Sequence, residues 1–200
     1  MTTPSDVVFS PAVKAIQTAR GSREGYARME RRGGWRAEAT PDLAAFIAQQ
    51  RSLFLATASV AGQPYIQHRG GPPGFLRVLD PETLAFADLA GNRQYITLGN
   101  LSENPRAQIF LIDYANRRRV KIWGEARVVA DDPALLAMLA PADARAEQAI
   151  VFRITAWDAN CPQHIPQRFE AEDVAAALAQ RDARIAELEA EVARLRGPAA

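Results

Sequence analysis

Polar side chains able to hold an anion gather in short stretches of the 200-residue sequence. The first stretch runs from Gln67 to Gly71 and ends in two glycines, which let a ligand approach the backbone closely. The second runs from Gly91 to Gln94, just before an expected helix. Backbone amides, a helix N-terminus and the Arg93 guanidinium together suit a phosphate group. Taken alone, each stretch is also compatible with a plain turn or an ordinary helix cap.

A third basic stretch, residues 117–119, enters a segment in which residue types alternate. Val120 and Ile122 alternate there with Arg119 and Lys121. This alternation predicts a strand over 119–130 with one core face and one wet or ligand-facing face. A basic run is usually a solvated hairpin. Arg119 lies inside the strand pattern, however, so we expect its guanidinium to have a specific environment.

The elements that must position these side chains fall into three zones. Residues 1–50 form an expected helical segment packed on the next zone, with helix starts at Ser10-Pro11 and Thr40-Pro41. Residues 51–170 are mostly strand, with expected helices at 94–103 and 133–140. Short strands between turn signals predict a mainly β, α+β fold, either an antiparallel barrel or a sandwich. The expected strands span 52–59, 64–68, 75–79, 83–88, 107–114, 119–130 and 150–157.

Residues 171–196 form the third zone, an expected long helix. Its apolar residues recur at alternating spacings of four and three, which is a heptad seam with Arg181 as its one polar member. An isolated helix this polar is marginal, so we expect it to have a partner. The seam either packs on the chain's own barrel or joins a second chain in a coil. The seam comprises Val174, Leu178, Arg181, Ile185, Leu188, Val192 and Leu195.

Composition excludes several classes of protein. Nearly half of the residues are hydrophobic (48%) and 24% are charged, which is typical of a globular chain. The net charge of +1 gives no case for nucleic acid or an anionic membrane, although 22 arginines accompany only 2 lysines. The single cysteine excludes an internal disulfide framework. No signal sequence or long apolar run is evident, so we expect a cytoplasmic protein.

Common catalytic signatures are absent from the sequence. It has no glycine-rich dinucleotide motif, no phosphate-binding P-loop and no nucleophile elbow. The only histidines are His68 and His164, and Cys161 to His164 lacks a second ligand pair, so we expect no metal site. Any activity is therefore expected to depend on a cofactor.

Four ordered stretches resemble the pyridoxamine 5'-phosphate oxidase-like family of FMN-binding split β-barrels. They are residues 67–75, 88–95, 113–119 and 160–166, and the resemblance covers roughly residues 40–170. It implies an FMN-binding split β-barrel, here with N-terminal helices and a long C-terminal helix. It also implies a homodimer with FMN at the subunit interface.

The resemblance assigns expected roles to particular residues. Gln67, Arg93 and Gln94 fall where the family holds the FMN phosphate, and Asp88 falls near its phosphate arm. The flavin ring is expected against the backbone of residues 68–71, and Arg119 is expected to reach the ring near N1 and C2=O. The candidate cofactor-binding residues are Gln67, His68, Arg69, Gly70, Gly71, Asp88, Asn92, Arg93, Gln94, Arg119 and Lys121.

A segment after the last expected strand supplies further candidates. Its polar residues Asn160, Gln163, His164 and Arg168 are expected to close the flavin cleft of the same or of a neighbouring subunit. The alternative is a structural crossover into the long helix.

The expected function is an FMN-dependent oxidoreductase acting on a small substrate, with a nicotinamide nucleotide as one possible electron donor. The alternatives are a flavin carrier or partner-docking module, a true pyridoxamine 5'-phosphate oxidase, and a haem or deazaflavin protein. The chain lacks the C-terminal segment with which the oxidase holds its substrate. We therefore expect a substrate other than a vitamin B6 phosphate.

Overall fold

The computed structural model describes residues 3–141, 145–160 and 162–197. Its contacts divide the chain into two compact units. The first comprises residues 1–113 and 118–162, and the second comprises 114–117 and 163–200. The first unit holds the sheet and the cavity described below.

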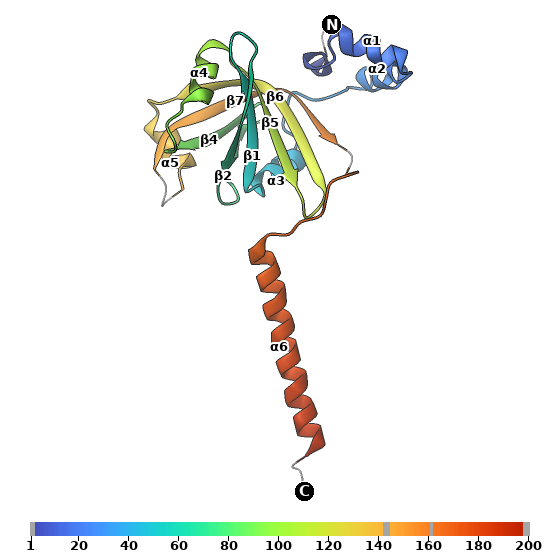
Figure 1. Cartoon of the computed structure of the whole chain (residues 1–200), viewed down its shortest axis with the longest axis vertical. Coiled ribbons are helices and arrows are strands. Elements are labelled where there is room, and N and C mark those ends of the chain that lie inside the picture. Colours follow the sequence, from blue (N-terminus) through green and yellow to red (C-terminus); the bar gives the residue numbers. More distant parts are fainter. Residues whose placement is uncertain (1–2, 142–144, 161, 198–200) are drawn as a thin grey trace. The chain divides into compact units, whose positions relative to one another are not determined.

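Seven antiparallel strands form one curved sheet in the order β2-β1-β5-β6-β7-β4-β3 (Figure 1). β2 and β3 stand at its two edges, so the barrel is split, as the family resemblance implied. The fold is therefore a split β-barrel with flanking helices. The strands are β1 (Ser52–Ala58), β2 (Pro64–Gly70), β3 (Arg77–Asp80), β4 (Thr83–Leu89), β5 (Arg106–Asp113), β6 (Arg118–Val129) and β7 (Ala146–Asn160).

The core lies on one face of this sheet because apolar side chains alternate along its strands. In β1, Leu53 and Leu55 are fully buried, and in β6 Val120 and Ile122 face the same interior. Helix α3 (Pro41–Ala48) adds a buried stripe to this core, comprising Leu43, Phe46 and Ile47. The stripe is the one expected from its helical spacing.

The N-terminal residues form η1 (Pro4–Val7), α1 (Pro11–Ala19) and α2 (Arg23–Arg31). Helix α1 begins as predicted, because the Ser10 hydroxyl accepts a hydrogen bond from the Val13 N–H. Trp35 then stacks on Trp123 of β6, with ring centroids 5.0 Å apart. This contact ties the N-terminal segment to the outer face of the sheet. The short η1 helix was not predicted.

The remaining helices are α4 (Ile96–Glu103), α5 (Pro133–Leu139) and α6 (Ala171–Arg196). Helix α5 packs on β4 and β7 through a small separate cluster that includes Leu139 and Ala149. Among the described residues, no helix combines the length and the apolar character needed to cross a bilayer.

The predicted ends of four elements are wrong, and one of these is β2, which continues to Gly70 instead of ending at residue 68. Helix α4 begins at Ile96, because Arg93 and Tyr95 adopt left-handed φ angles of 58° and 54° that no helix can contain. β3 begins at Arg77, since residues 75–76 belong to the buried turn before it. β7 extends beyond the predicted 150–157 at both ends, because it pairs with both β4 and β6.

Candidate functional site

The side chains of β2 divide between two faces. Its antiparallel pairing places Arg69 opposite Leu53 and Gln67 opposite Leu55. Paired residues point to the same side of a sheet, so Gln67 and Arg69 share the face of the buried core residues. Together with Tyr65 they line one wall of a cavity of 190 Å³.

The opposite wall comes from the end of β4 and the loop that follows it. Asp88 is the penultimate residue of β4, and residues 91–95 lead into helix α4. The Asn92 side-chain oxygen accepts a hydrogen bond from the Gln94 N–H at 3.2 Å, which fixes the turn. The cavity therefore lies between the edge strand β2 and the N-terminus of α4.

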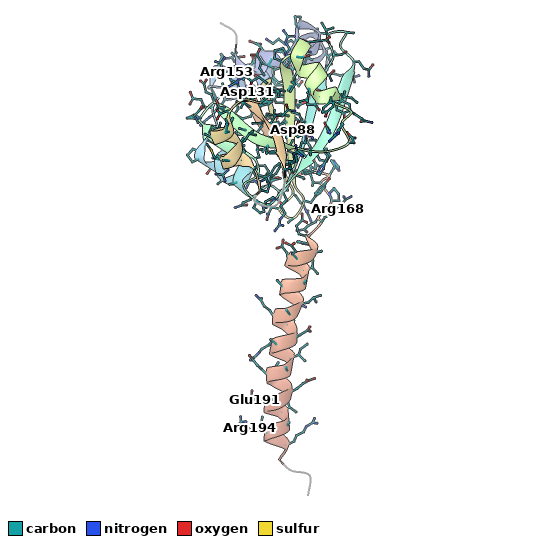
Figure 2. All side chains as sticks on the ribbon, turned by 90° about the vertical axis from the view of Figure 1, so that its left-hand side faces the viewer. Asp88, Asp131, Arg153, Arg168, Glu191 and Arg194 are labelled. Carbon is teal, nitrogen blue, oxygen red and sulfur yellow. The ribbon has the colours of Figure 1, made fainter. Side chains whose placement is uncertain are left out.

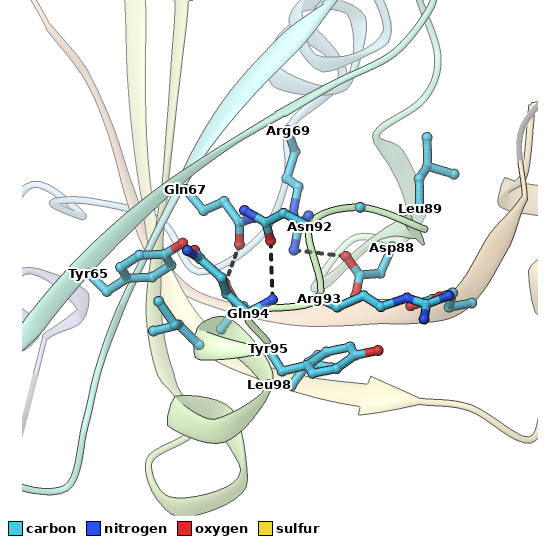
Figure 3. Close-up of a pocket in the computed structure, with 14 residues that line it drawn as sticks. Tyr65, Gln67, Arg69, Asp88, Leu89, Asn92, Arg93, Gln94, Tyr95 and Leu98 are labelled. Atoms are coloured by element: carbon cyan, nitrogen blue, oxygen red, sulfur yellow. Dashed lines mark hydrogen bonds and ion pairs between the residues drawn. The ribbon is translucent and has the colours of Figure 1, made fainter.

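Two side-chain contacts link the walls (Figure 3). The Thr97 hydroxyl donates to Gln67 Oε1 at 2.7 Å, and Thr97 is buried. Arg69 Nη2 lies 2.8 Å from Asp88 Oδ1, and the Gln148 amide donates to Asp88 Oδ2 at 2.9 Å. Asp88 thus holds the Arg69 guanidinium in place.

The cavity has donors suited to an anion. Arg69 Nε is buried and has no hydrogen-bond partner among the described residues, and such a group is costly unless a ligand satisfies it. Arg93 also lines the cavity. Tyr95, the N-cap of α4, makes no side-chain cap hydrogen bond, so no such bond shields the positive end of the helix dipole. Asp88 and Glu147 are the cavity's two carboxylates.

The structure brings together six of the predicted cofactor-binding residues. They are Gln67, Arg69, Asp88, Asn92, Arg93 and Gln94. Sequence reasoning missed Tyr65, Leu89, Tyr95, Thr97 and Glu147, which also line the cavity. Alternation along β2 could have found Tyr65, two residues before Gln67. Nothing in the sequence marks Glu147, because β7 reaches the cavity only through its pairing with β4.

His68, Gly70 and Gly71 do not line this cavity. His68 points to the other face of β2. There its ring and the Phe54 ring form an edge-to-face pair with ring centroids 5.5 Å apart. The Gly71 N–H donates to the Arg51 carbonyl at 3.0 Å. A Cβ at Gly71 would lie 2.6 Å from Phe75 Cβ. This glycine is therefore required by a tight turn, whatever else it does.

Arg119 and Lys121 lie on the outer face of the sheet. Lys121 is opposite Phe110 of β5, Phe110 is opposite Phe54, and Phe54 is opposite His68. One cross-strand row thus joins His68 to Lys121, away from the cavity. The Arg119 Nε group is buried without a hydrogen-bond partner among the described residues.

The predicted cleft-closing residues lie in or next to the second unit. Arg168 stacks over the Tyr114 ring at 4.9 Å, and the Gln167 amide donates to the Ala115 carbonyl at 2.8 Å. His164 has a left-handed φ of 65°, and Gln163 is exposed. The Asn160 side chain lies outside the described part of the chain. Their role at a cleft stays a prediction.

No cluster of three potential metal-ligating side chains occurs within residues 3–141, 145–160 and 162–197. The cavity is lined by guanidinium, amide and hydroxyl donors together with the carboxylates of Asp88 and Glu147.

Comparison with known families identifies the family to which the barrel segment belongs. Residues 39–161 match the family described as "Pyridoxamine 5'-phosphate oxidase". The chain belongs to the pyridoxamine 5'-phosphate oxidase family. This match spans every strand of the barrel and both walls of the cavity. No curated protein matches the sequence.

Solved structures of related shape include HupZ from Group A Streptococcus. It is 18% identical, with a TM-score of 0.48, and the likeness covers 65% of this chain and 98% of HupZ. An FMN-binding protein from Syntrophomonas wolfei is 13% identical, with a TM-score of 0.49 over 74% of this chain and 97% of that protein.

Proposed function

We propose that this protein binds FMN, with the phosphate in the cavity between β2 and α4, and that it is a flavin-dependent oxidoreductase acting on a small substrate. Membership of the pyridoxamine 5'-phosphate oxidase family supports the cofactor. The observation that carries the proposal is the buried Arg69 Nε group, which lacks a hydrogen-bond partner among the described residues beside a cavity lined by Arg93.

The residues present fit a phosphate monoester. Arg69 and Arg93 supply charge, and the Asn92–Gln94 turn presents backbone amides at the start of α4. The Thr97 hydroxyl donates a hydrogen bond to Gln67 Oε1, so the Gln67 side-chain NH₂ group can donate to a bound phosphate. Asp88 offsets part of the charge of Arg69, so Arg93 supplies the second cation at a cavity that Glu147 also lines.

The size of the cavity supports a shared site. Its 190 Å³ fall below the roughly 300–1,000 Å³ of a pocket that encloses a drug-sized ligand. One chain therefore encloses only part of FMN. Candidates His68, Arg119 and Lys121 stand on the other face of the sheet, beside the half-buried rings of Phe54 and Phe110. A homodimer in which a second chain covers this face accounts for both groups of residues.

In this proposal the protein orients the cofactor and excludes water, and the bound FMN carries out the chemistry. Bound FMN supplies hydride transfer at its N5 atom. Arg69, Arg93 and the α4 N-terminus anchor the phosphate and so fix the orientation of the whole cofactor. Arg119 supplies positive charge near the ring. Covering of the outer face by the second chain excludes water.

Anaerobic mixing of the FMN-loaded protein with NADH and NADPH tests the catalytic part of the proposal. We expect the flavin absorbance to bleach faster than that of free FMN with one of the two nucleotides. Absence of bleaching with either nucleotide would contradict a nicotinamide-dependent reductase. A parallel assay with pyridoxamine 5'-phosphate and oxygen is expected to form no pyridoxal phosphate.

A second candidate is a flavin carrier that docks on another chain. It is favoured by helix α6, every residue of which is exposed. Purification of the full chain and of a chain ending at Phe169 separates the two candidates. Co-purification of a different protein only with the full chain would favour docking. Equal bleaching by both forms would favour the enzyme.

A further inference from the structure

Helix α6 presents an apolar seam that no described residue of its own unit covers. All of its residues are exposed, and its six apolar seam residues have exposed fractions between 44% and 71%. Figure 2 shows its side chains projecting on all sides. Burial of an apolar stripe usually supplies most of the stability of a helix. The seam therefore requires an occupant, and its heptad pattern favours a second helix.

The heptad positions of the seam favour a two-stranded coil. With Leu178 at position a, the last two heptads place Ile185 and Val192 at a and Leu188 and Leu195 at d. β-branched residues at a with leucine at d favour two parallel strands. The same register places Arg184 and Glu191 at g, and Asp182, Glu189 and Arg196 at e.

The charges beside the seam are complementary for a parallel pairing of identical chains. In such a coil each g residue faces the e residue five positions later in the other chain. Arg184 then faces Glu189 of the second copy, and Glu191 faces Arg196. By symmetry each contact occurs twice, which gives four attractive contacts. Arg181, at position d, packs into a hole on the second copy that Asp182 of that copy helps to form.

An antiparallel pairing is less complementary. Its layers would place Leu178 opposite Leu195 and Ile185 opposite Leu188. Arg184 would still face Glu191, but Asp182 would face Glu189, which is repulsive. The existing pairs Arg184–Glu187 at 2.7 Å and Arg194–Glu191 at 3.5 Å are exposed. Exposed ion pairs contribute little to stability. Loss of these two pairs therefore does not oppose formation of the charged contacts between two copies of the helix.

We propose that α6 pairs with α6 of a second copy of this chain as a parallel, in-register, two-stranded coiled coil. The axis of such a coil is a two-fold axis, and the two chains enter it from the same end. The inference rests on the seam and its charges, and it does not require bound flavin. It goes beyond the homodimer proposed above, because it fixes which helix faces and which charged residues meet.

Disulfide trapping of the full chain tests this arrangement. The natural cysteine is first removed by Cys161→Ser. Leu195→Cys is then introduced at position d, and Ala190→Cys serves as the matched control at position f on the outer face. Under mild oxidation we expect Leu195→Cys to give a cross-linked dimer as the main species and Ala190→Cys to give little. Flavin content is measured in the same samples.

The outcomes separate the alternatives. In an antiparallel coil the two Leu195 positions would lie about 26 Å apart at 1.5 Å per residue. Cross-linking only in a Leu178→Cys/Leu195→Cys double variant would therefore overturn the parallel arrangement. Equal cross-linking of Leu195→Cys and Ala190→Cys, or of neither, would overturn the coil. Absence of flavin from both the cross-linked variants and the unsubstituted protein would instead contradict the cofactor proposal alone.

Discussion

At the scale of single residues, the loop before α4 combines charge with backbone strain. Arg93 and Tyr95 both have positive φ angles, which cost a non-glycine residue on the order of 1 kcal/mol or more. Such strain is often found at ligand sites, where the surrounding structure enforces it. Here the strained turn places both residues on the cavity wall.

Substitution of Arg93 tests whether this wall binds a phosphate. Arg93→Gln removes one charge-assisted contact, so we expect FMN affinity to fall about tenfold or more. Riboflavin lacks the phosphate, and its affinity is expected to be unchanged. Fluorescence titration with both flavins measures the two values.

Arg77→Gln is the matched control, because Arg77 is exposed on β3 and does not line the cavity. It is expected to leave both affinities unchanged. An equal loss of FMN and riboflavin affinity in Arg93→Gln would show that Arg93 acts on something other than the phosphate.

At this scale, residues from two of the predicted stretches line the cavity, but the sequence stretches alone do not show which of their side chains point into it. A strand sends only alternate side chains to one face. Gln67 and Arg69 therefore reach the cavity while His68 does not. Thr97 was missed because its contact with Gln67 joins residues 30 positions apart.

At the scale of elements, β6 depends on one glycine. A Cβ on Gly124 would lie 2.0 Å from the Arg153 carbonyl oxygen and 2.5 Å from Phe152 Cε1. The β6–β7 register shifts between Trp123 and Gly124, so the backbone forms a β-bulge at this point. Neither the carbonyl nor the buried ring can move away easily.

Two glycine substitutions form a matched pair. We expect Gly124→Ala to lower the free energy of unfolding by about 3 kcal/mol or more, because overpacking displaces backbone. Gly99→Ala in α4 meets nothing within 4 Å, and it is expected to raise that free energy by roughly 0.5–1 kcal/mol. Urea denaturation measures both. Similar stabilities for the two variants would contradict the close packing at Gly124.

The seam of α6 gives a second prediction at this scale. Arg181 is its one polar member, and a polar core residue lowers the stability of a coil. We therefore expect Arg181→Leu to tighten self-association, measured as a lower dissociation constant by sedimentation. Ala183→Leu at position f adds the same apolar side chain outside the seam and is expected to change nothing. Weaker association of Arg181→Leu would contradict the assigned register.

Elements were largely predictable from sequence because their periodicities and start signals are strong. Alternation identified β6, and Ser10-Pro11 and Thr40-Pro41 marked the starts of α1 and α3. The start of β7 was not predictable, since the polar residue Gln148 is paired with Asp88 of β4 and Glu147 lies at the register shift beside it.

At the scale of the whole molecule, the family match and the split barrel agree on the fold. The family and the fold do not specify the reaction. In our proposal the reaction depends on the cavity and on the second chain beside it. Pairing of sheet faces cannot be predicted from one sequence, because the outer face carries rings, histidine and basic side chains together rather than a simple apolar patch.

The most direct test of FMN binding by this protein is the absorption spectrum of the purified protein, with mass identification of the heat-released ligand. We expect oxidised-flavin bands, a released mass equal to that of FMN, and uptake of added FMN by any cofactor-free fraction. A colourless protein that takes up no FMN would contradict FMN binding. A Soret band with released haem would keep the fold and contradict the cofactor.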